Sequence, residues 1–255
     1  MLAIERRNAI LEKLQAEKRV VVSELSQIYD VSEETIRRDL EKLENDGFAI
    51  KSYGGAVINE NANLDFPFNI RKNWNIIEKQ KIAEIIGGMI QDGEKIILDA
   101  SSTAVAIVKQ LKGKKGLTLI TNSVEIVIET VDMLSDWRIL STGGVLKEGC
   151  LAMMGPQAER MIKSYHVDKA VISAKTVWKD DGFFDSDELH AAIKHTMLKA
   201  AKERILAVDS SKFGKMAFAK IGDFSDITTV VTDQSPPEDW CAFFEEKGIH
   251  CIYPQ

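Results

Sequence analysis

The stretch VSEETIRRDLEKLENDGFAIKSYGGAV, residues 31–57, decides how the N-terminal part of this 255-residue chain folds. Ser32 has a side chain that can cap a helix, and Ile36, Leu40 and Leu43 then recur at i, i+4 and i+7. This spacing gathers the three apolar side chains on one face. The stretch therefore predicts a capped helix that buries one side in a core.

Two adjacent arginines, Arg37 and Arg38, project from the other side of this helix. A helix with a buried stripe and cations on its outer face fits a DNA major groove. A shorter helix lies just before it, and Ser23 is predicted to be the N-cap of that helix. The pair of helices predicts a helix-turn-helix.

The flanking segments add a wing to this motif. A first helix is predicted over residues 4–16 and a short strand over residues 20–22. Residues 48–58 are predicted to form two short strands around Gly54 and Gly55, because adjacent glycines suit a turn that needs positive φ. Three helices and a hairpin predict a winged helix-turn-helix.

Net charge does not point to a nucleic-acid binder, because it is −6 for the whole chain. Binding to DNA phosphates therefore requires Arg37, Arg38, Lys42 and Lys51 to gather on one surface with the acidic side chains turned away. The candidate DNA-binding residues are Ser23, Ser32, Thr35, Arg37, Arg38, Lys42, Lys51 and Tyr53.

Thr35 and the two arginines are expected to face the groove. Neighbouring residues on a helix diverge by about 100°, so one arginine is expected to read a base edge and the other to hold phosphate. In the competing interpretation, Arg37 and Arg38 belong to a solvated face or pair with Asp39 and Glu41.

The pattern changes after the wing. Residues 59–77 are polar and rich in Asn, which predicts a linker between a first domain at 1–58 and a second domain at 78–255. From Glu78 onward, helical patterns alternate with short apolar runs, which predicts parallel β-α-β units in an open α/β sheet. Its strands are expected at 95–98, 117–120, 138–140, 170–173, 205–208, 227–231 and 249–253.

Polar side chains follow several of these strands. Ligands of open α/β sheets bind at the carboxyl ends of strands, and hydroxyls, helix-start N–H groups and lysine ammonium groups bind phosphate there. The sequence thus predicts a small anionic ligand, although the same residue types also serve as ordinary N-caps and turns. The candidate effector-binding residues are Asp99, Ser101, Ser102, Thr103, Thr121, Asn122, Ser123, Gly143, Gly144, Lys175 and Lys212.

Motifs of other site classes are missing from the sequence. It has no G-x-G-x-x-G, no G-x-x-x-x-G-K-[ST], no G-x-S-x-G and no C-x-x-C. We therefore expect no cofactor and no metal. No apolar run approaches the roughly 18 residues of a membrane span, and no signal peptide is seen, so we expect a cytoplasmic protein without a membrane partner.

The sequence resembles the DeoR family of bacterial transcriptional regulators. The resemblance is strongest in V-S-x-x-T-I-R-R-D-L at residues 31–40, L-E-x-x-G at 43–47 and GGA at 54–56, and it covers nearly the whole chain. It implies a sugar-phosphate sensor domain with a fold similar to ribose-5-phosphate isomerase. It also implies a homo-oligomeric repressor of carbohydrate genes that a phosphorylated sugar releases from operator DNA.

The sensor half departs from the family pattern. Glycine is usual in the family where this chain has Ser101, and glycines are also common at the positions of Ser173 and Thr176. The family tends to have glutamates where this chain has His190 and Ala192. A side chain at position 101 narrows the space for a phosphate.

Two alternatives to the repressor hypothesis stay open. In the first, the α/β domain of a DNA-binding protein only oligomerises. In the second, the chain is a sugar-phosphate isomerase, with Asp99, Asp185 or Glu188 as the general base and Lys212 steadying charge. We expect that the chain is not an enzyme.

Overall fold

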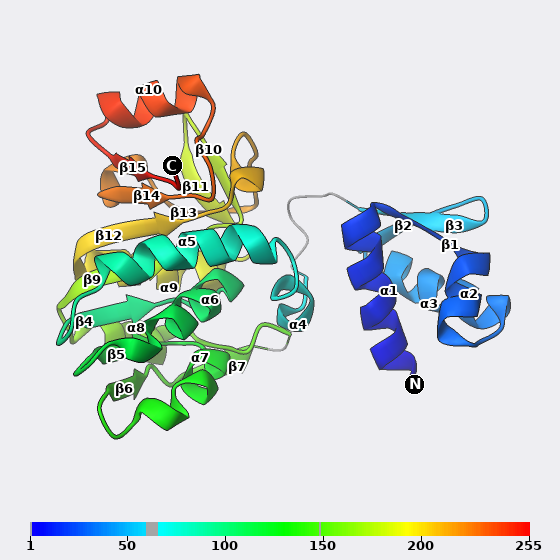
Figure 1. Cartoon of the computed structure of the whole chain (residues 1–255), viewed down its shortest axis with the longest axis horizontal. Coiled ribbons are helices and arrows are strands. Elements are labelled where there is room, and N and C mark those ends of the chain that lie inside the picture. Colours follow the sequence, from blue (N-terminus) through cyan, green and yellow to red (C-terminus); the bar gives the residue numbers. More distant parts are fainter. Residues whose placement is uncertain (1, 60–65, 148) are drawn as a thin grey trace. The chain divides into compact units, whose positions relative to one another are not determined.

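The computed structural model describes residues 2–59, 66–147 and 149–255. The chain forms two compact units, Met1–Trp74 and Asn75–Gln255, and each is described by itself (Figure 1). Within the described residues, every helix is too short or too polar to cross a lipid bilayer.

The N-terminal unit is a winged helix-turn-helix, as predicted. Its three strands form an antiparallel sheet in the order β1-β3-β2. Its elements are α1 (Ala3–Glu17), β1 (Arg19–Val21), α2 (Val22–Tyr29), α3 (Glu33–Asn45), β2 (Ala49–Ser52), β3 (Gly55–Ile58) and α4 (Phe68–Arg71).

The two predicted helix caps have different outcomes. Ser32 caps α3, since its Oγ accepts a hydrogen bond from the backbone N–H of Thr35 at 3.2 Å. The prediction that Ser23 caps α2 is wrong. The helix already begins at Val22, whose backbone N–H donates to the carbonyl of Gly54 in the wing at 2.8 Å. This bond satisfies a free N–H of the first turn without a side-chain cap.

The two glycines of the wing have different roles. Gly54 lies in the turn between β2 and β3 with a φ of +79°, a conformation that glycine adopts without strain. Gly55 already belongs to β3, where a Cβ atom would lie 2.0 Å from the carbonyl oxygen of Val20. The first glycine therefore permits the turn, and the second lets β1 approach β3.

Part of the segment predicted as a linker is built into the N-terminal unit. Phe66 and Ile70 are buried in the same apolar cluster as the residues of α1 and α3, and Phe66 also stacks on Phe48. Residues 60–65 lie outside the described residues. Burial of the aromatic and aliphatic side chains that follow them fixes the chain up to Trp74.

The C-terminal unit is an α/β domain around a seven-stranded parallel sheet in the order β15-β14-β12-β9-β4-β5-β6. The strands of this sheet are β4 (Lys95–Leu98), β5 (Thr118–Thr121), β6 (Arg138–Ser141), β9 (Val167–Ile172), β12 (Ala201–Ala207), β14 (Thr229–Val231) and β15 (His250–Ile252). The helices are α5 (Ile76–Met89), α6 (Ser102–Gln110), α7 (Val124–Glu129), α8 (Pro156–Lys163), α9 (Glu188–Lys199) and α10 (Glu238–Glu246).

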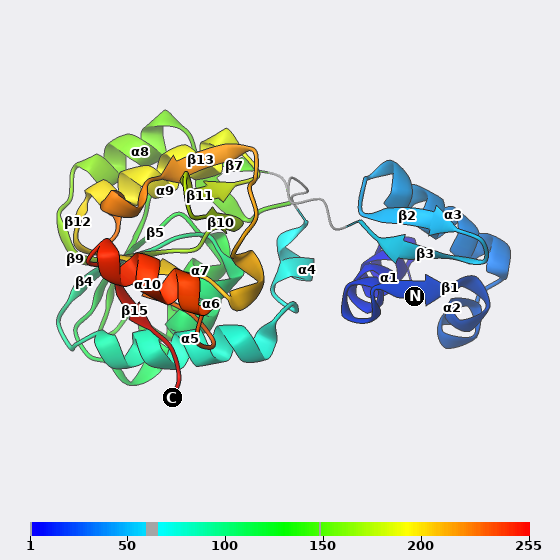
Figure 2. The same ribbon diagram turned by 90° about the horizontal axis from the view of Figure 1, so that it is seen from above.

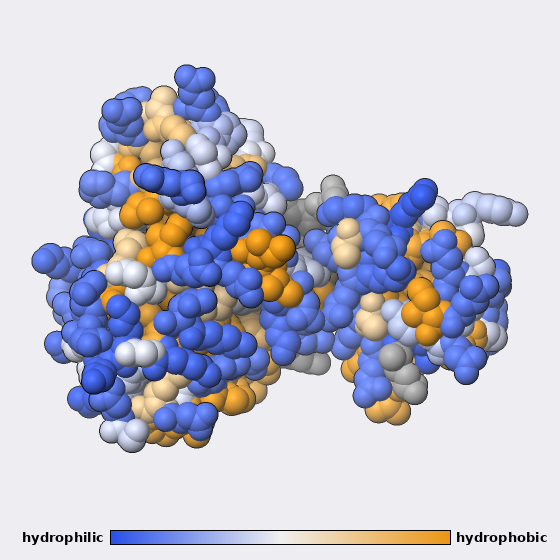
Figure 3. Space-filling model, in the orientation of Figure 1, coloured by the Kyte–Doolittle hydropathy of each residue, from blue (hydrophilic) through white to orange (hydrophobic). Residues whose placement is uncertain are grey.

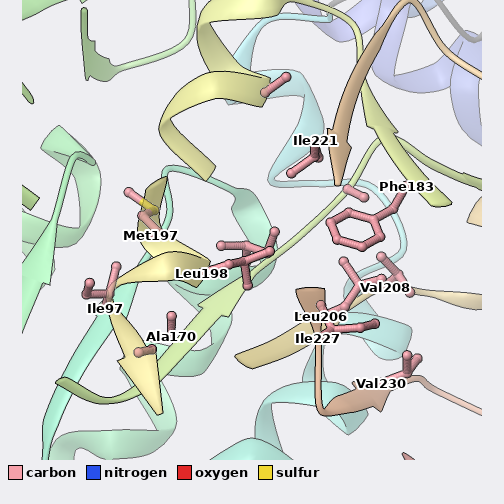
Figure 4. Packing of buried hydrophobic residues seen from close by; sticks show 14 of the residues in the cluster. Ile97, Ala170, Phe183, Met197, Leu198, Leu206, Val208, Ile221, Ile227 and Val230 are labelled. Atoms are coloured by element: carbon pink, nitrogen blue, oxygen red, sulfur yellow. The ribbon is translucent and has the colours of Figure 1, made fainter. Parts of the chain in front are cut away.

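Helices cover both faces of this sheet. α5 and α6 pack together on one face, and α8 and α9 pack together on the opposite face (Figure 2). Strand residues such as Ile97 and Ala170 share a buried cluster with Met197 and Leu198 of α9 (Figure 4). Hydrophilic residues predominate on the face of this unit that Figure 3 shows.

Five short antiparallel strands were not predicted by the sequence pattern. They form a three-stranded sheet in the order β10-β11-β13 and a β7-β8 hairpin. Their bounds are β7 (Val145–Lys147), β8 (Ala152–Met154), β10 (Thr176–Trp178), β11 (Gly182–Asp185) and β13 (Ala219–Gly222). Both structures follow the carboxyl ends of parallel strands, where the candidate effector residues also lie.

Candidate DNA interface and effector site

The outer face of α3 presents both arginines to solvent. Ile36 and Leu40 are fully buried on its inner face. The side chains of Arg37 and Arg38 are 56% and 76% exposed. The predicted orientation of the helix is therefore present in the fold, with both guanidinium groups accessible.

Each arginine nevertheless has a carboxylate partner one helical turn earlier. Arg37 pairs with Glu33 at 2.6 Å, and Arg38 pairs with Glu34 at 3.2 Å. The partners are not the Asp39 and Glu41 of the competing interpretation. Exposed pairs of this kind stabilise a helix by only about 0.3–0.5 kcal/mol, so a phosphate can displace the carboxylate at little cost.

The lysines of the candidate surface are also paired. Lys42 lies 2.9 Å from Asp46, and Lys51 lies 3.3 Å from Glu44. The expectation that the acidic side chains turn away from this surface is therefore wrong. For Lys42 the reason is helical geometry, since residues four apart on one helix face are neighbours, whereas Lys51 pairs with Glu44 of α3 from strand β2.

The remaining candidates lie around α3 and the wing. Tyr53 is fully exposed at the tip of the wing, and Ser23 is exposed in the first turn of α2. Thr35 is half-buried, with its hydroxyl 2.9 Å from that of Ser32. Ser32 and Thr35 thus shape the start of α3, whereas the exposed Tyr53 is available to a duplex.

A buried ion pair that sequence reasoning missed joins α3 to α1. Asp39 accepts from the guanidinium of Arg6 at 2.6 Å, and Arg7 lies 3.6 Å from the same carboxylate. Asp39 and Arg6 are both buried. The signal in the sequence was an aspartate placed next to Leu40 on the apolar side of the helix.

In the C-terminal unit, the sheet order brings the candidate effector loops to one edge. The chain runs outward from β4 through β5 to β6, then returns to place β9 beside β4 and continues to β12. Such a reversal is where open α/β sheets bind ligands. The loops after β12, β9, β4, β5 and β6 are consecutive along the carboxyl edge, so the predicted loops are neighbours.

Asp99 lies at this reversal and is 1% exposed. Its Oδ1 accepts from the backbone N–H of Ser101 at 3.2 Å and from the Ser101 hydroxyl at 2.5 Å. Its Oδ2 accepts from the backbone N–H of Ser173 at 3.0 Å and lies 3.3 Å from Nζ of Lys194. Both carboxylate oxygens are thus engaged by the protein, and Asp99 ties the loop after β4 to the loop after β9.

Lys194, a buried lysine of α9, is the second centre of this network and was not among the predicted site residues. Its Nζ donates to Asp185 at 2.6 Å and to the carbonyl of Ser173 at 2.9 Å. Burial would raise the pKa of Asp185, but the charges of Lys194 and His190 outweigh it and hold that pKa well below its ordinary value. The sequence signal was a lysine amid the buried side chains of an amphipathic helix.

Two of the candidate serines act as helix caps. The Oγ of Ser101 accepts from the backbone N–H of Ala104 at the start of α6, at 3.0 Å. The Oγ of Ser123 accepts from the backbone N–H of Ile126 at the start of α7, at 3.2 Å. The alternative interpretation of ordinary N-caps therefore accounts for these two hydroxyls.

Two buried polar atoms close to this edge have no hydrogen-bond partner among the described residues. They are Oδ1 of Asn122, directly after β5, and Oγ1 of Thr176, at the start of β10. The amide nitrogen of Asn122 does donate, to the carbonyl of Met153 at 3.1 Å. An unsatisfied buried polar group is costly, so both atoms are candidate contacts for a polar ligand.

Among the other effector-site candidates, some are needed for packing and others carry a charge that solvent can reach. Gly144 is required by packing, because a Cβ atom there would lie 2.4 Å from the carbonyl oxygen of Met154. Lys175 is half-buried, and its backbone N–H donates to Phe184 at 2.8 Å. The Lys212 side chain is 28% exposed. Of the remaining candidates, Ser102 and Thr103 begin α6, Thr121 is the last residue of β5, and Gly143 lies in the loop after β6.

The geometry gives little support to an isomerase site. Asp99 and Asp185 both pair with Lys194, and Asp99 also accepts hydrogen bonds from Ser101 and Ser173, so neither carboxylate is left unengaged to act as a general base. Glu188 is exposed and borders a groove between α8, α9 and β13, which none of the candidate effector residues lines.

Two family models match this chain. The model described as the DeoR-like helix-turn-helix domain matches residues 6–62, and the model described as the DeoR C-terminal sensor domain matches residues 74–234.

Full-length relatives are named as transcriptional regulators. The uncharacterized HTH-type transcriptional regulator YulB of Bacillus subtilis is 40% identical over 249 residues, which cover 98% of this chain and 96% of that protein. The L-fucose operon activator of Haemophilus influenzae is 34% identical over 95% of this chain and 97% of its own length. The transcriptional repressor AccR of Agrobacterium fabrum is 32% identical, with 90% and 89% covered.

Among solved structures, ribose 5-phosphate isomerase A from Methanocaldococcus jannaschii is a distant likeness. It is 19% identical, covers 53% of each chain and gives a TM-score of 0.37. This resemblance concerns the fold alone.

Proposed function

This chain belongs to the DeoR family and is a DNA-binding transcriptional regulator, and on that premise we propose that it represses carbohydrate genes until a phosphorylated sugar releases it from operator DNA. The observation that carries the DNA-binding part is the Ser32-capped helix α3 with two accessible arginines. Among the relatives, one is named a repressor and another an activator, and for this chain we propose repression.

In the proposed mechanism, α3 enters the major groove and the wing contacts the backbone. A pair of copies would place two such helices about 34 Å apart, to meet successive major grooves. A ligand that favours one arrangement of the C-terminal units then changes operator affinity by linkage. Because operator DNA is chromosomal, the protein would work in the bacterial cytoplasm.

Loss of either arginine should weaken operator binding. Arg37→Ala or Arg38→Ala is expected to cost about 1–3 kcal/mol if a base contact is lost, and to reduce the salt slope by about 1 if a phosphate contact is lost. Titrations of operator DNA at several salt concentrations distinguish the two roles.

Lys109→Ala is the matched control for this experiment. Lys109 is an exposed cation of the C-terminal unit that also pairs with a glutamate, Glu129, at 3.1 Å. Its removal should leave operator affinity unchanged. Wild-type binding by both arginine variants at equal salt would falsify the proposed interface.

The proposed effector site lies at the carboxyl edge of the seven-stranded sheet. The unsatisfied oxygens of Asn122 and Thr176 and the accessible Lys212 offer acceptors and a positive charge there. Asp99 and Lys194 already have hydrogen-bond partners within the protein. A ligand would therefore bind to Asn122, Thr176 and Lys212, or would replace one of the partners of Asp99 or Lys194.

A panel of phosphorylated sugars tests the sensor. A true effector at one hundred times its Kd should stabilise the protein by about 2.7 kcal/mol and raise its melting temperature. The unphosphorylated sugars are the controls. If no compound shifts the melting temperature, with or without operator DNA, the α/β domain serves only to assemble copies of the chain.

A further inference from the structure

A groove of about 1080 Å³ lies in the C-terminal unit, away from the candidate effector residues. Its borders are α8, α9 and β13, and both α8 and β13 pack against α9 (Figure 2). The floor is the outward stripe of α9, in which Glu188, Ala192, His195 and Lys199 recur at helical spacing. Lys194 faces inward from the same helix.

The two ends of this stripe carry opposite charges. Glu188 begins α9, and Lys199 ends it. The Lys199 side chain is 56% exposed, although its Nζ lies 2.6 Å from Asp226. Between the two charges, the stripe holds the small, exposed side chain of Ala192 and the half-buried ring of His195, so few atoms protrude from the helix there. Two such helices can therefore approach closely when they run antiparallel.

An exposed aromatic side chain stands at the edge of the same groove. Phe218 is 71% exposed and lines the groove next to Ala219. The part of the groove that α9 lines includes the small residues Ala191, Ala192 and Thr196, whereas Lys163, Tyr165, His166 and Lys220 line its sides. A large apolar ring beside such a concave surface is typical of an interface anchor. Both parts belong to one patch of one chain, which is the property that a two-fold interface between identical copies requires.

We propose that this groove is the interface between two copies of the chain, with α9 antiparallel to α9 of the second copy and Phe218 of each copy seated in the groove of the other. Antiparallel pairing forms two equivalent contacts, each between Glu188 of one copy and Lys199 of the other. The inference rests on the assembly of identical copies in the proposed function, and it assigns that assembly to a surface.

Sedimentation of the full-length protein over a dilution series tests the surface. Phe218→Glu and Ala192→Arg should each weaken self-association about 30-fold or more, as expected for a central anchor. Both positions are exposed in the single chain, so circular dichroism should show unchanged folding. Met216→Glu is the matched control, because Met216 is 49% exposed in the loop before Phe218 but does not line the groove.

Charge reversal tests the antiparallel arrangement. Glu188→Lys and Lys199→Glu should each weaken self-association, because each homodimer would then hold two like-charged contacts. An equimolar mixture of the two variants should restore a dimer, since both contacts become favourable in the mixed pair.

Three results would overturn the inference. A wild-type chain that sediments as a single copy at every concentration rejects both the interface and the proposed assembly. A stable dimer that none of the groove variants affects rejects the surface but leaves the assembly intact. If Ala192→Arg abolishes a melting shift by a sugar phosphate but leaves the dimer unchanged, the groove holds a small ligand instead.

Discussion

Replacing Asp39 with alanine should destabilise the N-terminal unit by about 3–5 kcal/mol, because it leaves the buried guanidinium of Arg6 without its counter-charge. This is a large share of the stability of a small domain. The loss should separate α1 from α3, and operator binding should fall with it. Hydrogen exchange followed by mass spectrometry localises the effect, with faster exchange over residues 3–58 and little change in the C-terminal sheet.

Two companion variants separate the buried pair from general effects of charge. Asp46→Ala removes an exposed partner of Lys42 and should cost less than about 0.5 kcal/mol. Replacing both buried partners, as Arg6→Met with Asp39→Leu, should recover much of the stability, because no unpaired charge then remains at the pair. Equal stability of Asp39→Ala and Asp46→Ala would rule out this account.

Replacing Lys194 with methionine should have a comparable effect on the C-terminal unit. The change leaves Asp99 and Asp185 buried without their shared cation, at an expected cost of about 3–5 kcal/mol near neutral pH. Lys109→Met, at an exposed ion pair, is the control and should be nearly neutral. Chemical unfolding, followed together with hydrogen exchange over residues 95–252, measures the loss of stability in both variants.

The pH dependence of these variants gives a second test. In the wild-type protein the pKa of Asp185 is depressed. The contribution of Asp185 to the free energy of unfolding is therefore complete above the ordinary carboxyl pKa of about 4, and it is lost as the pH falls below that value. In Lys194→Met the buried Asp185 carboxyl loses its main counter-charge and favours its protonated form, so acidification should reduce the loss of stability relative to the wild-type protein. A deficit that stays constant from pH 7 to pH 4 would contradict the role of Lys194 as their counter-ion.

Much of the fold could be predicted from local patterns. The first helix and all seven parallel strands lie within a few residues of their predicted places, because helices and buried strands are marked by short periodic or apolar runs. Helix α4 was not predicted and lies in the segment 59–77 that was predicted as a linker. Ser32, which directly precedes such a run, caps α3 as its residue type predicts. The five antiparallel strands were missed because each is only three or four residues long and pairs with partners that local pattern does not reveal.

The errors near the DNA interface also have local physical causes. Ser23 has the right residue type for a cap, but the carbonyl of Gly54, from the wing, takes over that role. The acidic partners of Arg37 and Arg38 lie at i−4 on the same helix, at Glu33 and Glu34, and not at the Asp39 and Glu41 of the competing interpretation. Each candidate cation of α3 therefore has an acidic neighbour on the same helix face.

By itself the amino-acid order determined which segments become helices or parallel strands, where α3 begins, and that polar loops follow the strands, since each of these depends on residues a few positions apart. Tertiary structure alone decided that β9 returns to lie beside β4, that Lys194 joins Asp99 to Asp185, and that Arg6 meets Asp39 across 33 residues. These contacts depend on which buried surfaces pack together once the whole chain is compact. Charge pairs and the neighbours within a sheet are therefore chosen by long-range packing and not by local propensity.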